Sequence, residues 1–373
     1  MFNSFHLQGV DALRESKYIE AKKLFLEAIK QNPEVPETYF LLGKTCFLCD
    51  EKSETISYLI QFIELTQYEK EQENKSHAFD LLGQCYASRS ESELAITCYL
   101  NALEIDPSCV SVRHNLGLLY MKLAQEYLEI DLQNCSALLK SARIALNSAL
   151  ELCKDNPMFL HSIASWYEQY IELLKKLSEA SNTQEMISEQ FNWAIHYYRE
   201  ALAHCHKNDK LFQNVITENL TECYAQFGHH LYQSQAYAKA QKLYESALDL
   251  DQNHIPALNQ IGMCLFKQGK YSEARVKFAI LLERTADTQD QADAWLNTAC
   301  CYRLEKNWLE AEKSLDAARK LAPQDPEIHK ETENLKQAKS QALLAVTNQT
   351  FFDPKAHYNS SLTSQNTDSL QYN

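Results

Sequence analysis

The spacing of the few glycines is the feature of this sequence that most restricts its fold. Only seven of the 373 residues are glycine. Three intervals between successive glycines equal 34 residues: Gly9 to Gly43, Gly83 to Gly117, and Gly228 to Gly262. A fixed period between 20 and 50 residues is typical of repeat proteins. Glycine inside a helix costs up to about 1 kcal/mol relative to alanine, so its return at one register predicts close packing of two helices there.

Other residues keep the same register as the glycines. If each unit is counted from 1 to 34 with glycine at position 8, small residues fall at positions 20 and 27, an aromatic at 24 and proline at 32. The unit 76–109 has all of them, as Gly83, Ala95, Tyr99, Ala102 and Pro107. This pattern resembles the tetratricopeptide repeat, whose signature is W-x2-L-G-x2-Y, then A-x3-F, then P.

The resemblance covers residues 2–325 and implies an all-α fold, a right-handed superhelical α-solenoid of about eight helix-turn-helix units. We expect the following division: 2–109 as units one to three, 110–220 as units four and five, 221–325 as units six to eight, 326–345 as a capping helix, and 346–373 as a disordered tail. The tail is rich in Asn, Ser, Thr and Gln, a composition that buries too little apolar surface to fold.

The central units carry insertions. The second halves of units four and five arrive 13 and 18 residues late, and about 12 extra residues precede unit six. Residues 121–128 and 170–177 keep helical apolar spacing. We therefore expect the first helices of units four and five to be lengthened by two or more turns. The insertions are either tolerated without a role or form a docking ridge.

Charge and composition restrict the partners. The chain has 36 basic and 50 acidic residues, a net charge of −14, which repels phosphate backbones and argues against nucleic-acid binding. Residues 1–109 carry 10 basic and 18 acidic side chains, a net of −8 that favours a basic partner there. No apolar stretch is long enough for membrane insertion. Twelve cysteines without a secretion signal predict free thiols and a cytoplasmic protein.

The sequence lacks the short motifs of nucleotide-binding, hydrolytic and zinc enzymes. We therefore predict a non-enzymatic protein without cofactor. Cys46 and Cys49 have no second ligand pair at zinc spacing. His204, Cys205 and His206 are the one dense cluster of soft ligands, but adjacent helical residues point about 100° apart, so no metal site is predicted.

Family resemblance also implies a partner-binding groove. In tetratricopeptide proteins the first helices of successive units line a concave surface, and partner peptides contact positions 2, 5, 9, 12 and 13. Apolar residues at these positions are not needed for the repeat core, which favours the aromatic and methionine side chains among them. The predicted groove residues are Phe40, Lys44, Phe47, Gln84, His114, Met121, Lys122, Asn259, Met263, Phe266, Lys267 and Arg303.

These observations predict a protein–protein interaction scaffold or adaptor that binds a peptide or helix of a partner. An assembly or secretion chaperone that holds a client protein is the nearest alternative. A helical-repeat RNA binder and a metal-regulated switch at His204, Cys205 and His206 are less favoured alternatives. The sequence does not indicate the oligomeric state.

Overall fold

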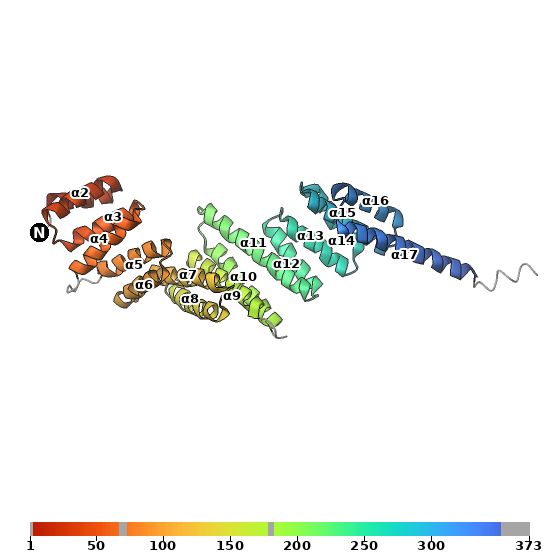
Figure 1. Cartoon of the computed structure of the whole chain (residues 1–373), viewed down its shortest axis with the longest axis horizontal. Coiled ribbons are helices and arrows are strands. Elements are labelled where there is room, and N and C mark those ends of the chain that lie inside the picture. Colours follow the sequence, from red (N-terminus) through yellow and green to blue (C-terminus); the bar gives the residue numbers. More distant parts are fainter. Residues whose placement is uncertain (1–2, 67–72, 178–182, 352–373) are drawn as a thin grey trace, which may run out of the picture. The chain divides into compact units, whose positions relative to one another are not determined.

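The structure, a computed structural model, describes residues 3–66, 73–177 and 183–351. Across these residues it contains 17 α-helices and no strand (Figure 1). The chain divides into two compact units, Met1–Cys223 and Tyr224–Asn373. The predicted all-helical class is confirmed.

The first unit contains ten complete helices: α1 (Ser4–Arg14), α2 (Tyr18–Gln31), α3 (Pro36–Leu48), α4 (Lys52–Leu65), α5 (Glu73–Ser88), α6 (Ser92–Ile105), α7 (Val110–Tyr127), α8 (Leu132–Leu152), α9 (Pro157–Leu177) and α10 (Thr183–His204). Helix α11 (Lys210–Gln233) runs across the division between the units. The second unit continues with α12 (Tyr237–Leu250), α13 (Ile255–Lys267), α14 (Tyr271–Arg284), α15 (Thr288–Leu304), α16 (Trp308–Leu321) and α17 (Pro326–Phe351).

Within each unit the helices form a stack of antiparallel hairpins. Second helices also pack on the first helix of the next hairpin, as α2 does on α3 and α14 on α15. Successive first helices contact one another, as α3 and α5 do, whereas no such pairing of second helices is prominent in the described residues. The first helices therefore form the inner row of each stack, as a helical solenoid requires.

The helical glycines lie where the two helices of a hairpin cross. A Cβ atom placed on Gly83 would lie 2.5 Å from Cε1 of Tyr99, which stands at position 24 of the same repeat. The other five helical glycines face their own position-24 residue in the same way: Gly9 faces Phe25, Gly43 Leu59, Gly117 Leu146, Gly228 Tyr244, and Gly262 Phe278. The packing role predicted from the 34-residue period is confirmed.

The turn inside the hairpins also has a recurring geometry, at position 15 of the repeat. Six residues there adopt positive φ: Ser16, Asp50, Ser90, Gln235, Gly269 and Lys306. The residue after each of them donates its backbone N–H to a carbonyl five residues earlier, for example Asn307 to Tyr302 at 2.9 Å. Each helix thus ends at a residue in the left-handed conformation, which glycine adopts without strain.

Two substitutions at position 15 should shift stability in opposite directions. Gly269 has φ of +77° and nothing within 4 Å of its Cβ position, so Gly269→Ala introduces backbone strain and no clash. We expect it to lower the free energy of unfolding by about 1 kcal/mol. Lys306→Gly, which relieves the same strain, should raise it by up to about 1 kcal/mol. Urea titrations of the two variants measure both effects, and equal signs would refute the assignment of strain.

The central helices are longer than the others, as expected, but the lengthening is shared differently. Helices α3 and α4 have 13 and 14 residues, whereas α7, α8, α9 and α10 have 18, 21, 21 and 22. The expected lengthening of the first helices by two or more turns is met by α9, which has eight residues more than α3, whereas α7 has only five more. Both helices of each hairpin grow, because an apolar face lengthened on one helix is buried only if its partner is lengthened as well.

Helix α17 closes the second unit. Its Ile328 and Leu335 are buried in a cluster with Ala299, Leu315 and Ala318 of α15 and α16. The helix continues past the predicted end at residue 345 as far as Phe351, so residues 346–351 are helical rather than part of a disordered tail. The remainder of the predicted tail, 352–373, lies outside the described residues.

Candidate interaction surface

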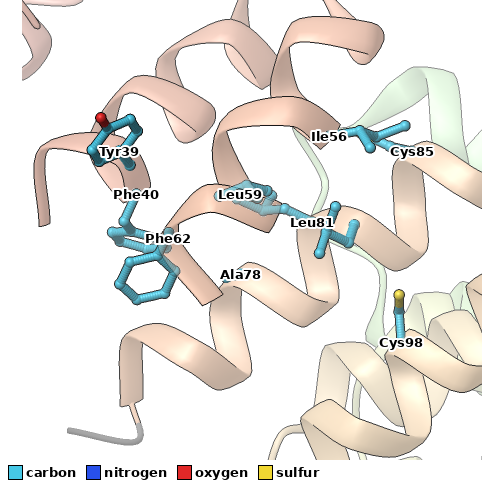
Figure 2. Close-up of a cluster of buried hydrophobic side chains, with 10 residues drawn as sticks. Tyr39, Phe40, Ile56, Leu59, Phe62, Ala78, Leu81, Cys85 and Cys98 are labelled. Carbon is cyan, nitrogen blue, oxygen red and sulfur yellow. The ribbon is translucent and has the colours of Figure 1, made fainter. Parts of the chain in front are cut away.

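The inner row of first helices places the predicted groove residues in three different environments. The first is full burial, and Phe40 is an example with 4% of its surface exposed. Its ring centroid lies 5.3 Å from that of Phe62 on α4 and 5.5 Å from that of His77 on α5. Figure 2 shows Phe40 and Phe62 beside each other in this buried cluster. Phe40 is thus a core residue.

His114 and Met121 on α7 are buried as well, with 4% and 5% of their surfaces exposed. His114 Nε2 lies 2.8 Å from the hydroxyl of Ser162 on α9, and its ring packs on Phe159 at 4.7 Å. Burial lowers the pKa of His114 to about 4, so the imidazole is neutral near pH 7. The premise that positions 5 and 12 are free of the repeat core is therefore wrong here. Neighbouring first helices touch directly, and His114 fills that contact on α7.

A second group of predicted residues is engaged by polar neighbours. Gln84 Nε2 donates to Asp80 at 3.0 Å. Arg303 donates through Nε and through a terminal nitrogen to the Glu331 carboxylate of α17. Because Glu331 is 5% exposed, the capping helix covers Arg303 and holds its charge. Asn259 is also partly covered, and its buried Oδ1 has no hydrogen-bond partner among the described residues.

The third group remains accessible. In the first unit Lys122 is exposed, and Lys44 and Phe47 are partly exposed. In the second unit Lys267 is exposed, and Met263 and Phe266 are partly exposed. Each unit thus presents lysine beside apolar side chains on its inner row of helices.

The sequence prediction did not extend the groove register to unit five, although that unit begins at Pro157. The same positions there are Met158, His161, Ser165, Glu168 and Gln169. Met158 is 53% exposed. His161 Nε2 lies 2.8 Å from Nδ2 of Asn219 on α11, and burial lowers the pKa of His161.

Glu168 is the centre of a buried polar group. Its Oε2 accepts a hydrogen bond of 2.6 Å from the hydroxyl of Tyr198 on α10, and that hydroxyl lies 3.1 Å from the hydroxyl of Ser165. Burial raises the pKa of Glu168 to about 7, although the hydrogen bonds from Tyr198 and Cys223 oppose the shift. A carboxyl group at this place takes up a proton close to neutral pH.

Three buried thiols have a raised pKa, which is the opposite of what nucleophilic catalysis requires. Burial raises the pKa of Cys46 and Cys264 to about 12 and that of Cys85 to about 11. A nucleophilic cysteine needs a lowered pKa, so these three thiols are protonated side chains of the core at neutral pH.

Metal-ligating side chains converge at one place in the described residues, where single atoms of Cys46, Glu51 and Glu54 lie within 4.8 Å of one another. The ammonium group of Lys22 already lies between the two carboxylates, at 2.6 Å and 2.7 Å. The cluster is thereby an ion-paired site. His204, Cys205 and His206 form no comparable group in the part of the chain that the structure describes.

Comparison with known proteins agrees with this architecture. Residues 83–123 match a model described as TPR repeat, and residues 231–291 match one described as Tetratricopeptide repeat. Among solved structures, MamA is 18% identical with a TM-score of 0.40 and covers 52% of this chain and 93% of its own. The TPR domain of P58(IPK) is 18% identical with a TM-score of 0.32 and covers 90% and 98%. PilF of Pseudomonas aeruginosa is 19% identical with a TM-score of 0.35 and covers 71% and 100%.

The hairpin stack and the glycine register define a helical-repeat protein. With the two repeat matches, the chain is a tetratricopeptide repeat protein. None of the helices in the described ranges combines the length and apolar character needed to cross a membrane.

Proposed function

We propose that this chain is a non-enzymatic scaffold that binds a peptide or helix of a partner protein along its inner rows of first helices. Tetratricopeptide repeats support a protein-interaction scaffold in general. The observation that carries the specific proposal is the accessible group of lysine and apolar side chains that each inner row retains after packing. The free state of all twelve cysteines supports a reducing compartment such as the cytoplasm.

The chemistry of that surface indicates what it would bind. Lys44 and Phe47 in the first unit, and Phe266 and Lys267 in the second, combine a cationic group with apolar contact area. A segment with acidic residues near aromatic or aliphatic ones complements both features. Aromatic anchors commonly contribute most of the binding energy in such interfaces, and the lysines would add specificity and a faster association rate.

Reversing the inner-row charges should abolish this binding. The variant Lys44→Glu, Lys122→Glu, Lys267→Glu replaces three accessible cations with carboxylates that repel an acidic partner. We expect this variant to capture the most abundant specific partners from the native host in amounts at least tenfold lower than the unmodified protein does. The melting temperature of the variant should stay within a few degrees of that of the unmodified protein. Affinity purification with quantitative mass spectrometry measures the loss.

A matched control separates the inner row from net charge. Lys140→Glu, Lys239→Glu, Lys242→Glu changes the charge by the same amount at exposed positions of the second helices α8 and α12. Its capture profile should match that of the unmodified protein. If both triple variants lose the same proteins to the same extent, the inner-row assignment is wrong.

A further inference from the structure

A hollow lies at the step where the short hairpins of the first unit meet the long ones. It has a volume of about 740 Å³, within the range of roughly 300–1,000 Å³ seen for ligand sites. Its walls come from the turn before α6 and the start of that helix, the end of α7, and the first half of α8. None of the predicted groove residues lines it.

The hollow follows from the unequal lengths of neighbouring hairpins. Helices α7 and α8 have 18 and 21 residues, whereas α5 and α6, which precede them, have 16 and 14. The α5–α6 hairpin therefore ends at the turn of residues 89–91, before it can cover the added turns of α7 and α8. In a solenoid each hairpin normally buries the face of the next one, and here part of that face stays open.

The opposite flank of the α7–α8 hairpin is covered, because α9 and α10 are lengthened as well. The indole Nε1 of Trp166 donates to the carbonyl of Leu139 at 2.7 Å, and Arg143 lies over the Trp166 ring at 5.0 Å. Near the tip of the hairpin, Lys176 pairs with Glu129 at 2.7 Å. One flank thus has a hairpin packed against it and the other has the hollow.

The open flank is apolar at its floor. Ile96 and Leu123 are partly buried against the core cluster of α6 and α7, which fixes their positions. Leu94 and Tyr127, at the edges, are 49% and 37% exposed. These side chains line the hollow together with Leu138 of α8.

The rim of the hollow is acidic. Glu91, Glu93 and Glu126 line it, and no lysine, arginine or histidine does. Glu91 is paired with Arg89 at 2.8 Å, whereas Glu93 and Glu126 have no ion pair among the described residues. Both are exposed. The hollow therefore combines an apolar floor with uncompensated negative charge.

We propose that this hollow is a second docking surface, separate from the inner row, for an amphipathic helix with lysine or arginine beside an apolar stripe. The shape argues for a helix, because the missing neighbour on this flank is a continuation of a helical hairpin. The charge argues for a basic segment, since Glu93 and Glu126 would pair with cations flanking the apolar contacts. The surface does not depend on the proposed function of the inner row.

A synthetic probe tests the proposal with the full chain. The probe is a fluorescent amphipathic peptide of leucine and lysine, about 14 residues or four helical turns long. Its counterpart replaces every lysine with glutamate in the same pattern. We expect the lysine peptide to bind and the Glu93→Lys, Glu126→Lys variant to bind it about tenfold more weakly by fluorescence anisotropy, since two attractive contacts become repulsive.

The control variant makes the same change of charge on α6 and on α8, away from the hollow. Glu104→Lys and Glu151→Lys alter exposed residues at the far ends of α6 and α8, and together they should leave the affinity within twofold. Leu94→Ser with Tyr127→Ser should weaken binding about tenfold without a charge change, which tests the apolar contacts at the edges of the hollow. Equal weakening of lysine-peptide binding by the Glu93/Glu126 and Glu104/Glu151 variants would overturn the proposal. The glutamate peptide complements the inner-row lysines instead, and loss of its binding in the Glu93→Lys, Glu126→Lys variant would overturn the proposal as well.

A second copy of the chain is the competing occupant, and the same variants distinguish it. In analytical ultracentrifugation, the unmodified chain and the Leu94→Ser, Tyr127→Ser variant should sediment with the same mass. A dimer that dissociates in the Leu94→Ser, Tyr127→Ser variant would assign the hollow to self-association instead. Lys44→Gln with Lys267→Gln should leave probe binding unchanged, so failure of the inner-row proposal and failure of this one are separately visible.

Discussion

Gly83→Leu should destabilise the third hairpin by about 1–3 kcal/mol. The Cβ of any side chain at this position would lie 2.5 Å from Cε1 and 2.7 Å from Cδ1 of Tyr99, and Tyr99 is itself 2% exposed. The ring has no space into which it could move, so α5 and α6 must separate and lose packing along their length. Thermal and urea unfolding monitored by circular dichroism measure the loss.

Two further variants give this prediction its control. Thr97→Leu adds the same apolar side chain at an exposed position of α6, and it should change the free energy of unfolding by less than about 0.5 kcal/mol. In a Tyr99→Ala background the clash is gone, so Gly83→Leu should cost less than it does alone. Additive costs for the two substitutions would show that Gly83 does not act through Tyr99.

The glycine register could be predicted from sequence because a short-range rule produces it. Each glycine meets position 24 of its own hairpin, so the partner lies 16 residues away in a regular unit such as Gly83 with Tyr99. Such a contact repeats whenever the unit repeats, and the 34-residue period therefore locates it. The same reasoning located the hairpins, and it failed only where hairpins differ in length.

The inner row was harder to predict because its environment depends on the neighbouring unit. Phe40 and His114 occupy the same position of two units, and each is buried by a residue of the next first helix, His77 and Phe159 respectively. Whether that position faces a partner or a neighbouring helix depends on how closely the first helices approach. Periodicity within one unit carries no information on that distance, so it cannot distinguish an aromatic side chain that contacts a partner from a core side chain such as Phe40.

The buried carboxyl group of Glu168 has a direct consequence for stability. Its pKa is raised from 4.5 to about 7 in the folded protein. The folded state therefore binds more protons than the unfolded state between these two values, and stability falls as the pH rises through that window. Burial is the main cause of the raised pKa. The carboxylates of Glu222 and Glu172 raise it further, whereas Tyr198 and Cys223 lower it by donating hydrogen bonds.

Glu168→Gln should therefore stabilise the first unit at high pH and have little effect at low pH. The amide cannot ionise, and its oxygen can still accept the hydrogen bond from Tyr198. From the raised pKa, the gain in the free energy of unfolding approaches about 3 kcal/mol above pH 7 and vanishes below about pH 4.5. Urea titrations of both proteins at pH 4.5, 6 and 8 measure the difference.

The control for this experiment is Glu189→Gln, which removes a carboxylate from an exposed position of α10. It should shift the unfolding free energy by less than about 0.5 kcal/mol at each pH. A Glu168→Gln variant that is equally stable relative to the unmodified protein at pH 4.5 and pH 8 would show that the carboxyl is hydrated and ionised in the folded state. Stabilisation confined to pH 6 and above would instead establish that burial between α9 and α10 keeps the Glu168 carboxyl protonated, against the opposing effect of the Tyr198 hydrogen bond.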